Sequence, residues 1–219
     1  ILLSGSPRMQ RAAFHRSFST PGPVVLPVIH VLDSAQAKRN LATVIRCGAP
    51  GAFLINHDFE ISQFVPIIEE CRRAYPDLWL GVNFLGVSGA KAFPILSDLA
   101  AKGVVVDAYW ADDAQIDERR KEQTEADSIA AIRESCGWGG MYFGGTAFKK
   151  QRAVEPSKYH EAAGLATGYM DAVTTSGIAT GQSADIEKVK SFREGVKNHA
   201  LAIASGITPE NVGDYMDVA

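Results

Sequence analysis

The stretch "ALAIASGITPENV", residues 200–212, contains a pattern that recurs along this chain. Residues 201–204 form a short apolar run bounded by turn residues, which predicts a strand covered on both faces of a parallel sheet. Gly206 then permits a sharp turn or the close approach of a ligand. Thr208 has the features of a helix N-cap, with proline at the first helical position. This order predicts an anion site, because helix N-termini favour negative charge. A well-capped βα loop without a ligand is the alternative.

The same succession of strand and helix recurs seven times. Strand-like runs occupy residues 24–31, 52–56, 79–85, 104–109, 141–143, 172–175 and 201–204. Helical patterns occupy residues 35–47, 61–75, 90–102, about 116–136, 156–167, 184–198 and those from 208 onward. Because no hairpin signal separates these segments, seven βα units predict a parallel sheet.

Right-handed crossovers leave two α/β architectures, an open doubly wound sheet and a (β/α)₈ TIM barrel. Seven units are many for an open sheet and one too few for a barrel. An eighth strand would follow Ala219, so we expect a barrel whose eighth βα unit is not in this sequence. The predicted organisation is one barrel domain, with residues 1–22 as an N-terminal extension and residues 23–219 as units one to seven. An open sheet is the less favoured alternative.

Composition excludes several classes of protein. The chain has 219 residues, of which 46% are hydrophobic and 21% charged, as in ordinary globular domains. A net charge of -3 and the absence of a basic cluster argue against nucleic-acid binding. No apolar run is long enough to span a bilayer, and no signal peptide is visible. The odd cysteine count of three, without metal spacing, predicts reduced thiols and a cytoplasmic location.

In a barrel, functional groups lie at the carboxyl ends of the strands. Polar or glycine residues follow six of the predicted strands: His30 and Asp33; Asn56, His57 and Asp58; Asn83; Asp107, Trp110, Asp112 and Asp113; Gly144, Gly145, Thr146 and Lys149; Ser176, Gly177, Thr180 and Gly181. Such a set predicts one pocket. The aspartates have a structural alternative, because Asp33, Asp58 and either Asp112 or Asp113 are suited to cap the helices that follow.

Four motifs resemble the BtpA/SgcQ family of (β/α)₈ barrels: "VIHVLD" (28–33), "GVNFLG" (81–86), "DAVTTSGIATG" (171–181) and "IASGITPENV" (203–212). The resemblance covers nearly the whole chain from about Val24. It implies similarity to ribose-phosphate-handling barrels, whose last two strands are followed by phosphate-holding loops. The implied phosphate ligands are Ser176, Gly177, Thr180, Gly181, Ser205, Gly206 and Ile207. The chain departs from the family pattern at residues 56–58, 107–109 and 145–149.

From the strand ends and the resemblance, we predict an enzyme that binds a small phosphorylated ligand: a sugar phosphate, a nucleotide or a phosphoribosyl compound. Acid–base catalysis would use Asp33, Asp58 or Asp107, with His30 or His57 as partner. Lys149 would supply electrostatic stabilisation. The residues predicted to contact substrate are His57, Asn83 and Trp110.

The alternative is a non-catalytic ligand-binding or assembly factor of the BtpA type. A phosphoribosylanthranilate isomerase is disfavoured, because that enzyme uses a cysteine after its first strand and "VIHVLD" has none. No cofactor and no metal are predicted, since His30, His57 and Asp58 lack a recognised metal spacing. The sequence leaves a homo-oligomer open.

Overall fold

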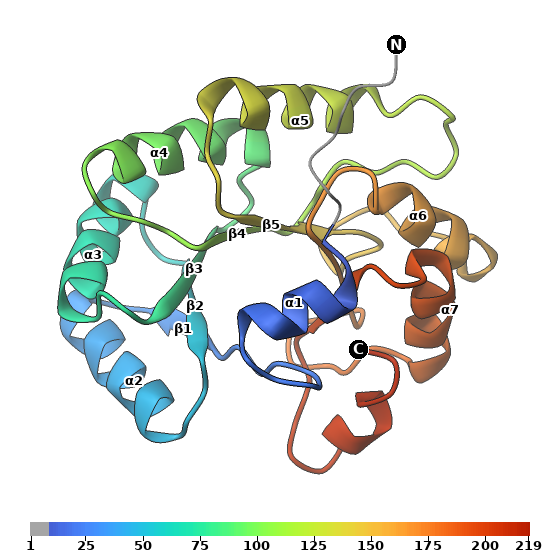
Figure 1. Cartoon of the computed structure of the whole chain (residues 1–219). Coiled ribbons are helices and arrows are strands. Elements are labelled where there is room, and N and C mark those ends of the chain that lie inside the picture. The colour runs from blue at the N-terminus through green and yellow to red at the C-terminus, as the bar shows by residue number, and fades with distance from the viewer. Residues whose placement is uncertain (1–8) are drawn as a thin grey trace. The chain divides into compact units, whose positions relative to one another are not determined.

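A computed structural model describes residues 9–219 of the chain, and residues 1–8 of the predicted N-terminal extension lie outside that range. The strands are β1 (Val28–Val31), β2 (Gly51–Asn56), β3 (Trp79–Phe84), β4 (Ala108–Ala111), β5 (Met141–Gly145), β6 (Ala172–Ser176) and β7 (Ala200–Ala204). The α-helices are α1 (Arg11–Ser17), α2 (Ser34–Arg46), α3 (Ile61–Ala74), α4 (Gly89–Ala101), α5 (Thr124–Cys136), α6 (Tyr159–Ala166) and α7 (Ile186–Val196). Two 3₁₀ helices are η1 (Pro156–Lys158) and η2 (Val212–Tyr215). The predicted α/β fold with seven strands is confirmed, and it is consistent with part of a TIM barrel (Figure 1).

The described chain divides into two compact units. The β1–β4 unit comprises Val24–Ala111 and Ser128–Met141. The β5–β7 unit comprises residues 9–23, Asp112–Asp127 and Tyr142–Ala219. Within each unit the strand order follows the chain, and the paired strands are parallel. The carboxyl ends of neighbouring strands therefore meet at one edge of the sheet in each unit.

In the β1–β4 unit, strands β2, β3 and β4 are buried on both faces, whereas β1 alternates exposed and buried residues. All six residues of β2 are buried. β2 pairs with β1 at Val28↔Phe53 and with β3 at Ile55↔Asn83. Burial of both faces explains why β2 has a continuous apolar sequence instead of an alternating one.

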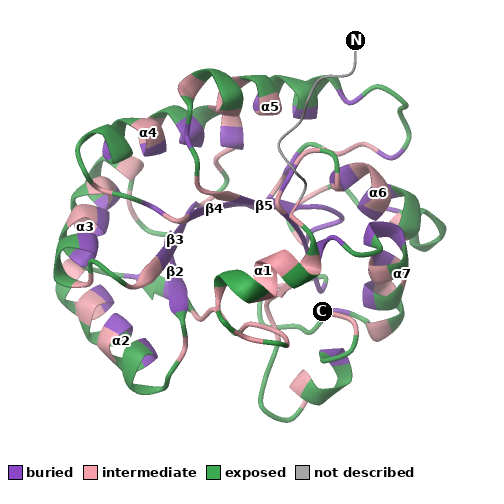
Figure 2. Ribbon diagram, viewed as in Figure 1, coloured by how far each residue is buried: buried purple, intermediate pink, exposed green. Residues whose placement is uncertain are grey.

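Helices α2, α3 and α4 lie along the strands of this unit (Figure 1). Leu41, Phe64 and Phe93 are fully buried, one from each helix. Burying such side chains stabilises the fold by about 1.5–3 kcal/mol each. The helices accordingly show buried and exposed sides in Figure 2.

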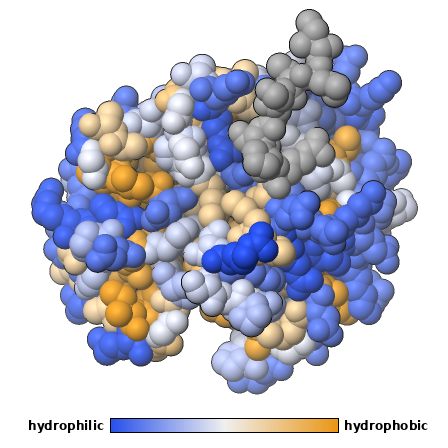
Figure 3. Space-filling model, in the orientation of Figure 1, coloured by the Kyte–Doolittle hydropathy of each residue, from blue (hydrophilic) through white to orange (hydrophobic). Residues whose placement is uncertain are grey.

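In the β5–β7 unit, β6 is the central strand. It pairs with β5 at Gly144↔Val173 and with β7 at Thr174↔Ala202. Helices α6 and α7 approach closely, because a Cβ at Gly195 would overlap the carbonyl of His160. Figure 3 shows a largely hydrophilic surface over these two helices, as expected for their solvent-facing sides.

Helix α1 was not among the predicted elements. It begins where the backbone N–H of Arg11 donates to the carbonyl of Asn198 at 2.7 Å. The ring of Phe14 packs edge-on against Phe143, with centroids 5.9 Å apart. These contacts with distant segments, rather than a local helix signal, attach α1 to the unit.

Two predicted boundaries were wrong. β4 begins at Ala108, after Asp107 instead of before it. Helix α5 begins at Thr124, whereas the helical pattern was predicted to begin at about residue 116. The intervening loop has its own hydrogen bonds, because the Gln123 side chain binds the backbone N–H and carbonyl of Asp117 and the carbonyl of Arg120. A glutamine used in this way holds the loop out of the helix.

Candidate functional site

The predicted histidines lie near the carboxyl ends of two strands: His30 is within β1 and His57 follows β2. His30 and His57 are exposed, and their rings stack with centroids 4.6 Å apart at 13°. Asp33 caps α2, since its Oδ1 accepts a hydrogen bond from the backbone N–H of Gln36 at 2.7 Å. Asp58 is exposed, and it does not cap α3, because Glu60 takes that place. The structure thus brings the two histidines together in open surroundings.

The predicted substrate contacts Asn83 and Trp110 are buried in the β1–β4 unit. Asn83 is fully buried in β3. The Trp110 ring packs edge-on against Phe53, with centroids 5.9 Å apart, as in a hydrophobic core. Asn56 joins two strand ends, donating to the carbonyl of Phe59 and accepting from the backbone N–H of Leu85. A role of Asn83 and Trp110 in substrate binding stays a prediction.

Asp107 does not lie where its predicted catalytic role requires. It precedes β4, at the amino end of the strand, whereas His57 and Asp58 follow the carboxyl end of β2 and His30 lies one residue before the end of β1. Its Oδ2 accepts hydrogen bonds from the Arg72 guanidinium at 2.5 Å and from the backbone N–H of Leu80 at 2.8 Å. The boundary error has a physical reason: the carboxylate is engaged by a buried arginine that is 35 residues away in the sequence.

The loops after β6 and β7 contain the predicted phosphate ligands, and the structure brings these loops together. The backbone N–H of Gly181 donates to the Ser205 hydroxyl at 2.8 Å. Gly206 has a φ of +71°, and a Cβ there would overlap the backbone of Gln182 and Ser183. Thr180 and Ile207 are exposed, and Gly177 is buried. Glycine is therefore required at position 206 by close loop packing and by its left-handed backbone.

The helix predicted after Gly206 is not formed. The segment from Thr208 to Asn211 is a turn, followed only by the four-residue η2. Asn211 shapes this turn, because its side chain accepts from the backbone N–H of Thr208 and donates to the carbonyl of Gly206, both at 2.8 Å. The Thr-Pro-Glu sequence therefore starts a turn, and the helix dipole invoked for a phosphate site is missing. Phosphate binding by these loops stays a prediction.

Three lysines belong to segments beside the carboxyl ends of β5 and β6, and we call them the lysine cluster: Lys149 and Lys150 in the loop after β5, and Lys188 in α7. The backbone N–H of Lys149 donates to the Ser176 hydroxyl at 3.0 Å, and that hydroxyl donates to the carbonyl of Gly177. The ammonium of Lys150 lies 4.0 Å from the carboxylate of the buried Asp112. Burial lowers the pKa of Lys149 below its usual value, and the charge of Asp112 partly offsets this.

Lys188 was missed in the sequence, although it is the most buried amine of the cluster. From α7, its Nζ donates to the carbonyls of Ala147 at 2.6 Å and Ser176 at 2.8 Å. Its ammonium also lies 5.2 Å from the Tyr159 ring centroid. Burial lowers its pKa to about 8. One signal could have revealed it: Lys188 stands four residues before the buried Phe192, on the apolar stripe of its helix.

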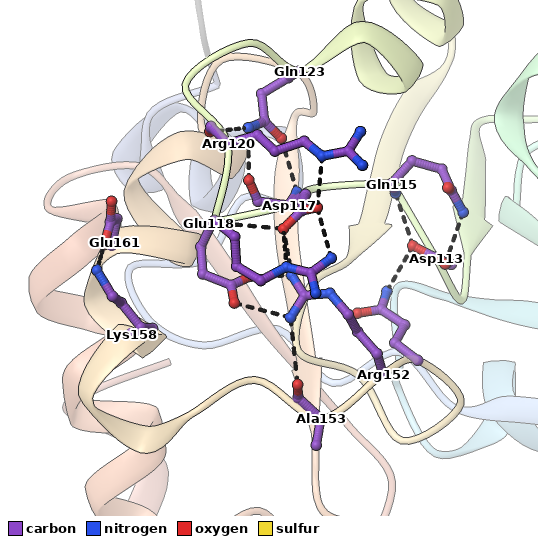
Figure 4. A network of polar contacts seen from close by, with 12 residues as sticks. Asp113, Gln115, Asp117, Glu118, Arg120, Gln123, Arg152, Ala153, Lys158 and Glu161 are labelled. Carbon is purple, nitrogen blue, oxygen red and sulfur yellow. Dashed lines mark hydrogen bonds and ion pairs between the residues drawn. The ribbon is translucent and has the colours of Figure 1, made fainter.

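A second polar feature of the β5–β7 unit is a pocket of about 300 Å³, lined in part by Gln151 and Arg152 of the segment after β5. Its lining includes Asp113, Asp117, Arg119, Arg120 and Arg152. Asp117 accepts from Arg119 at 2.8 Å and from Arg152 at 2.9 Å. Figure 4 shows Asp117 beside Arg152. The charges are therefore largely paired within the protein.

Two carboxyl groups of this region respond in opposite ways. The Arg152 guanidinium bonded to Glu118 lowers the pKa of that carboxyl. Burial instead raises the pKa of Asp113, whose carboxylate is hydrogen-bonded by Gln115 and Gln151 but by no arginine among the described residues. Of these two carboxyl groups, Asp113 is thus the one that keeps its proton to the higher pH.

Metal ligands do not gather in the described residues. Within residues 9–219, no group of three or more His, Cys, Asp or Glu side chains could hold a metal ion. No helix in the same range is long and apolar enough to cross a membrane. The candidate site therefore consists of the lysine cluster with Ser176, Asp112 and Asp113.

Comparison with known proteins gives similarity in fold. No family model and no curated protein matches the chain. An enolase from Bradyrhizobium complexed with magnesium and mandelic acid is 18% identical, with a TM-score of 0.59, over 89% of this chain and 48% of that one. A 3,6-anhydro-D-galactonate cycloisomerase from Zobellia galactanivorans is 13% identical, with a TM-score of 0.60, over 91% and 52%. A dipeptide epimerase from Enterococcus faecalis V583 is 10% identical, with a TM-score of 0.57, over 90% and 52%.

These comparisons correct the family prediction. The structures that the chain resembles include mandelate racemase/muconate lactonizing proteins, an enolase, an epimerase and a cycloisomerase, so the assignment to BtpA/SgcQ ribose-phosphate-binding barrels is wrong. The four motifs misled because strand ends with glycine-rich turns occur in many barrels. The chain spans about half the length of these structures. At such low identity the similarity establishes a barrel-type α/β fold.

Proposed function

We propose that this chain is the barrel part of an enzyme that binds a small anionic molecule at the carboxyl ends of β5 and β6. One observation carries the proposal: the ammonium of Lys188 and the backbone N–H of Lys149 both hydrogen-bond Ser176, and the Lys150 ammonium lies 4.0 Å from the carboxylate of Asp112. Two of these lysines have pKa values lowered by burial, so they lie out of bulk water, where an ammonium attracts an anion more strongly. Carboxyl ends of strands are also where barrel enzymes bind their substrates.

Proton transfer in this enzyme is assigned to Asp113. Burial raises the pKa of Asp113, so its carboxyl keeps a proton to a higher pH than an ordinary aspartate does. The lysine cluster would stabilise negative charge that develops on the substrate. The same site without turnover would be a ligand-binding protein, and a turnover assay separates the two.

The anion is either phosphorylated, as the sequence predicts, or a carboxylic acid. The joined loops after β6 and β7 favour a phosphate, because their backbone groups lie close together. The Bradyrhizobium enolase, in contrast, is described with mandelic acid and magnesium. The residues of this chain do not fit magnesium, since no cluster of three suitable ligands forms in residues 9–219.

Calorimetric titration with inorganic phosphate, ribose 5-phosphate and mandelate tests the proposal. We expect Lys149→Ala to weaken binding of the preferred anion by about tenfold or more, the scale of one charge-assisted hydrogen bond. Lys158→Ala is the matched control, because this exposed lysine of the same unit pairs with Glu161 at 2.6 Å. Equal affinity of both variants and the unmodified chain would contradict the proposal.

A further inference from the structure

Lys188 differs from the other members of the lysine cluster in its partners and its position. Its Nζ contacts two backbone carbonyls, and no carboxylate pairs with it within residues 9–219. The rings of Tyr159 and Phe192 lie 5.2 and 5.9 Å from it. The charged form is thus held only by dipoles and ring faces, while burial opposes it.

The geometry also suits the neutral amine. A neutral amine keeps two N–H donors and gains one lone pair, and the two carbonyls of Ala147 and Ser176 can accept both donors. Deprotonation would then leave the contacts in place and free the lone pair. The pKa of about 8 makes this form available near neutral pH.

Three threonine hydroxyls of the segments that supply these carbonyls have no hydrogen-bond partner in the described part of the chain. Thr146, Thr174 and Thr175 are buried, and no hydrogen-bond partner of their Oγ1 atoms is found in the described part of the chain. Thr146 directly precedes Ala147, and Thr175 directly precedes Ser176, the two residues whose carbonyls hold Lys188. Buried polar groups of this kind commonly hydrogen-bond water or a ligand.

We propose that Lys188 is a nucleophile that forms an imine with a small 2-oxo acid bound at the β5–β6 mouth. The inference rests on the proposed function for the anionic half of the ligand. The nitrogen lone pair forms the C–N bond as the carbonyl π pair moves to oxygen, and the oxygen gains the proton that nitrogen loses. The carbinolamine then expels hydroxide, which takes a proton from solvent and leaves as water, so that a protonated imine remains.

Reductive trapping tests the inference. The chain is incubated with pyruvate and cyanoborohydride at neutral pH, digested, and mapped by mass spectrometry. We expect alkylation at Lys188 to exceed that at exposed lysines by about tenfold or more, because more of its amine is neutral. Lys190 is the internal reference, since it is exposed on the same helix and pairs with Glu187 at 2.8 Å.

Two variants sharpen the test. Lys188→Met should abolish the selective label, whereas Lys190→Met should keep it. Equal labelling of Lys188 and Lys190 in the unmodified chain would overturn the inference, and that result does not depend on how any variant folds. Propionaldehyde, which carries no charge, separates the two proposals: selective labelling by it without pyruvate labelling or anion binding would retain the nucleophile and contradict the anion site.

Discussion

Two buried cations, one in each unit, are held in contrasting ways. Arg72 in the β1–β4 unit donates to the carbonyls of Val105, Tyr75, Pro76 and Leu78 and pairs with the carboxylate of Asp107. Lys188 in the β5–β7 unit donates to two carbonyls and faces two rings. Arg72 lies beside the amino end of β4, and Lys188 beside the carboxyl ends of β5 and β6.

The difference separates a structural charge from a chemical one. A buried charge that is fully paired is stable in its charged form, whereas one without a counter-charge shifts its pKa instead. Arg193 shows that carbonyl partners alone do not suffice for chemistry. It donates to the carbonyls of Val218, Lys197 and His199, but an arginine does not deprotonate in proteins. A lysine in a similar setting can lose its proton.

Arg72→Met offers the largest effect and tests the structural half of the comparison. We expect the free energy of unfolding to fall by about 3–5 kcal/mol, because Asp107 would be left without its counter-charge. Arg73→Met is the matched control, since Arg73 is the exposed neighbour on the same helix. Urea denaturation followed by circular dichroism measures both. Similar losses in the two variants would contradict the role of Arg72.

Asp107→Asn removes the negative charge and keeps the side-chain shape. We expect a loss of about 1.5–3 kcal/mol, the cost of losing a hydrogen bond to a charged group. Because the predicted catalytic role of Asp107 lacks geometrical support, affinity for anions should stay unchanged in calorimetric titration. Weakened anion binding without loss of stability would show that Asp107 serves the site.

Lys188→Met tests the Lys188 half of the comparison through the pH dependence of the free energy of unfolding. The folded-state pKa of Lys188 is lowered to about 8 from 10.5, so the unfolded chain binds more protons between these values. Stability contributed by this group therefore rises with pH across that window, by at most about 1.4 kcal/mol per pH unit. In Lys188→Met this rise should vanish, as measured by urea denaturation at pH 7.5, 9 and 10. A rise of the same slope in the variant would mean that Lys188 is not its source.

His57→Ala gives the smallest effect and supplies an exposed reference for both buried cations. The stacked rings of His30 and His57 lie in water, so we expect a loss of about 0.5–1 kcal/mol. A double-mutant cycle with His30→Ala isolates the stacking energy. A coupling well above this range would indicate that the pair has a role beyond ring contact.

The seven strands could be predicted because each is a short apolar run that ends in turn residues, and burial on both faces requires such runs. The cap at Asp33 was also available, as the alternative to catalysis, since an N-cap bond links residues three apart. Two element predictions, the strand that was to include Asp107 and the helix from Thr208, were wrong for a different reason. Asp107 and the Thr208 turn have local signals that fit their predicted roles, but distant or side-chain partners decide their conformation.

By itself the sequence determined the βα repeat, the fold class, and the strand ends at which Lys149 and Ser176 lie, because these depend on periodicities over a few residues. Only the tertiary structure decided which groups meet there. Lys188 reaches a carbonyl 41 residues earlier in the chain, and Gly206 packs against Gln182 and Ser183. Such contacts depend on how the elements pack. Packing determines whether a buried cation pairs with a carboxylate, as Arg72 does, or hydrogen-bonds only carbonyls, as Lys188 does.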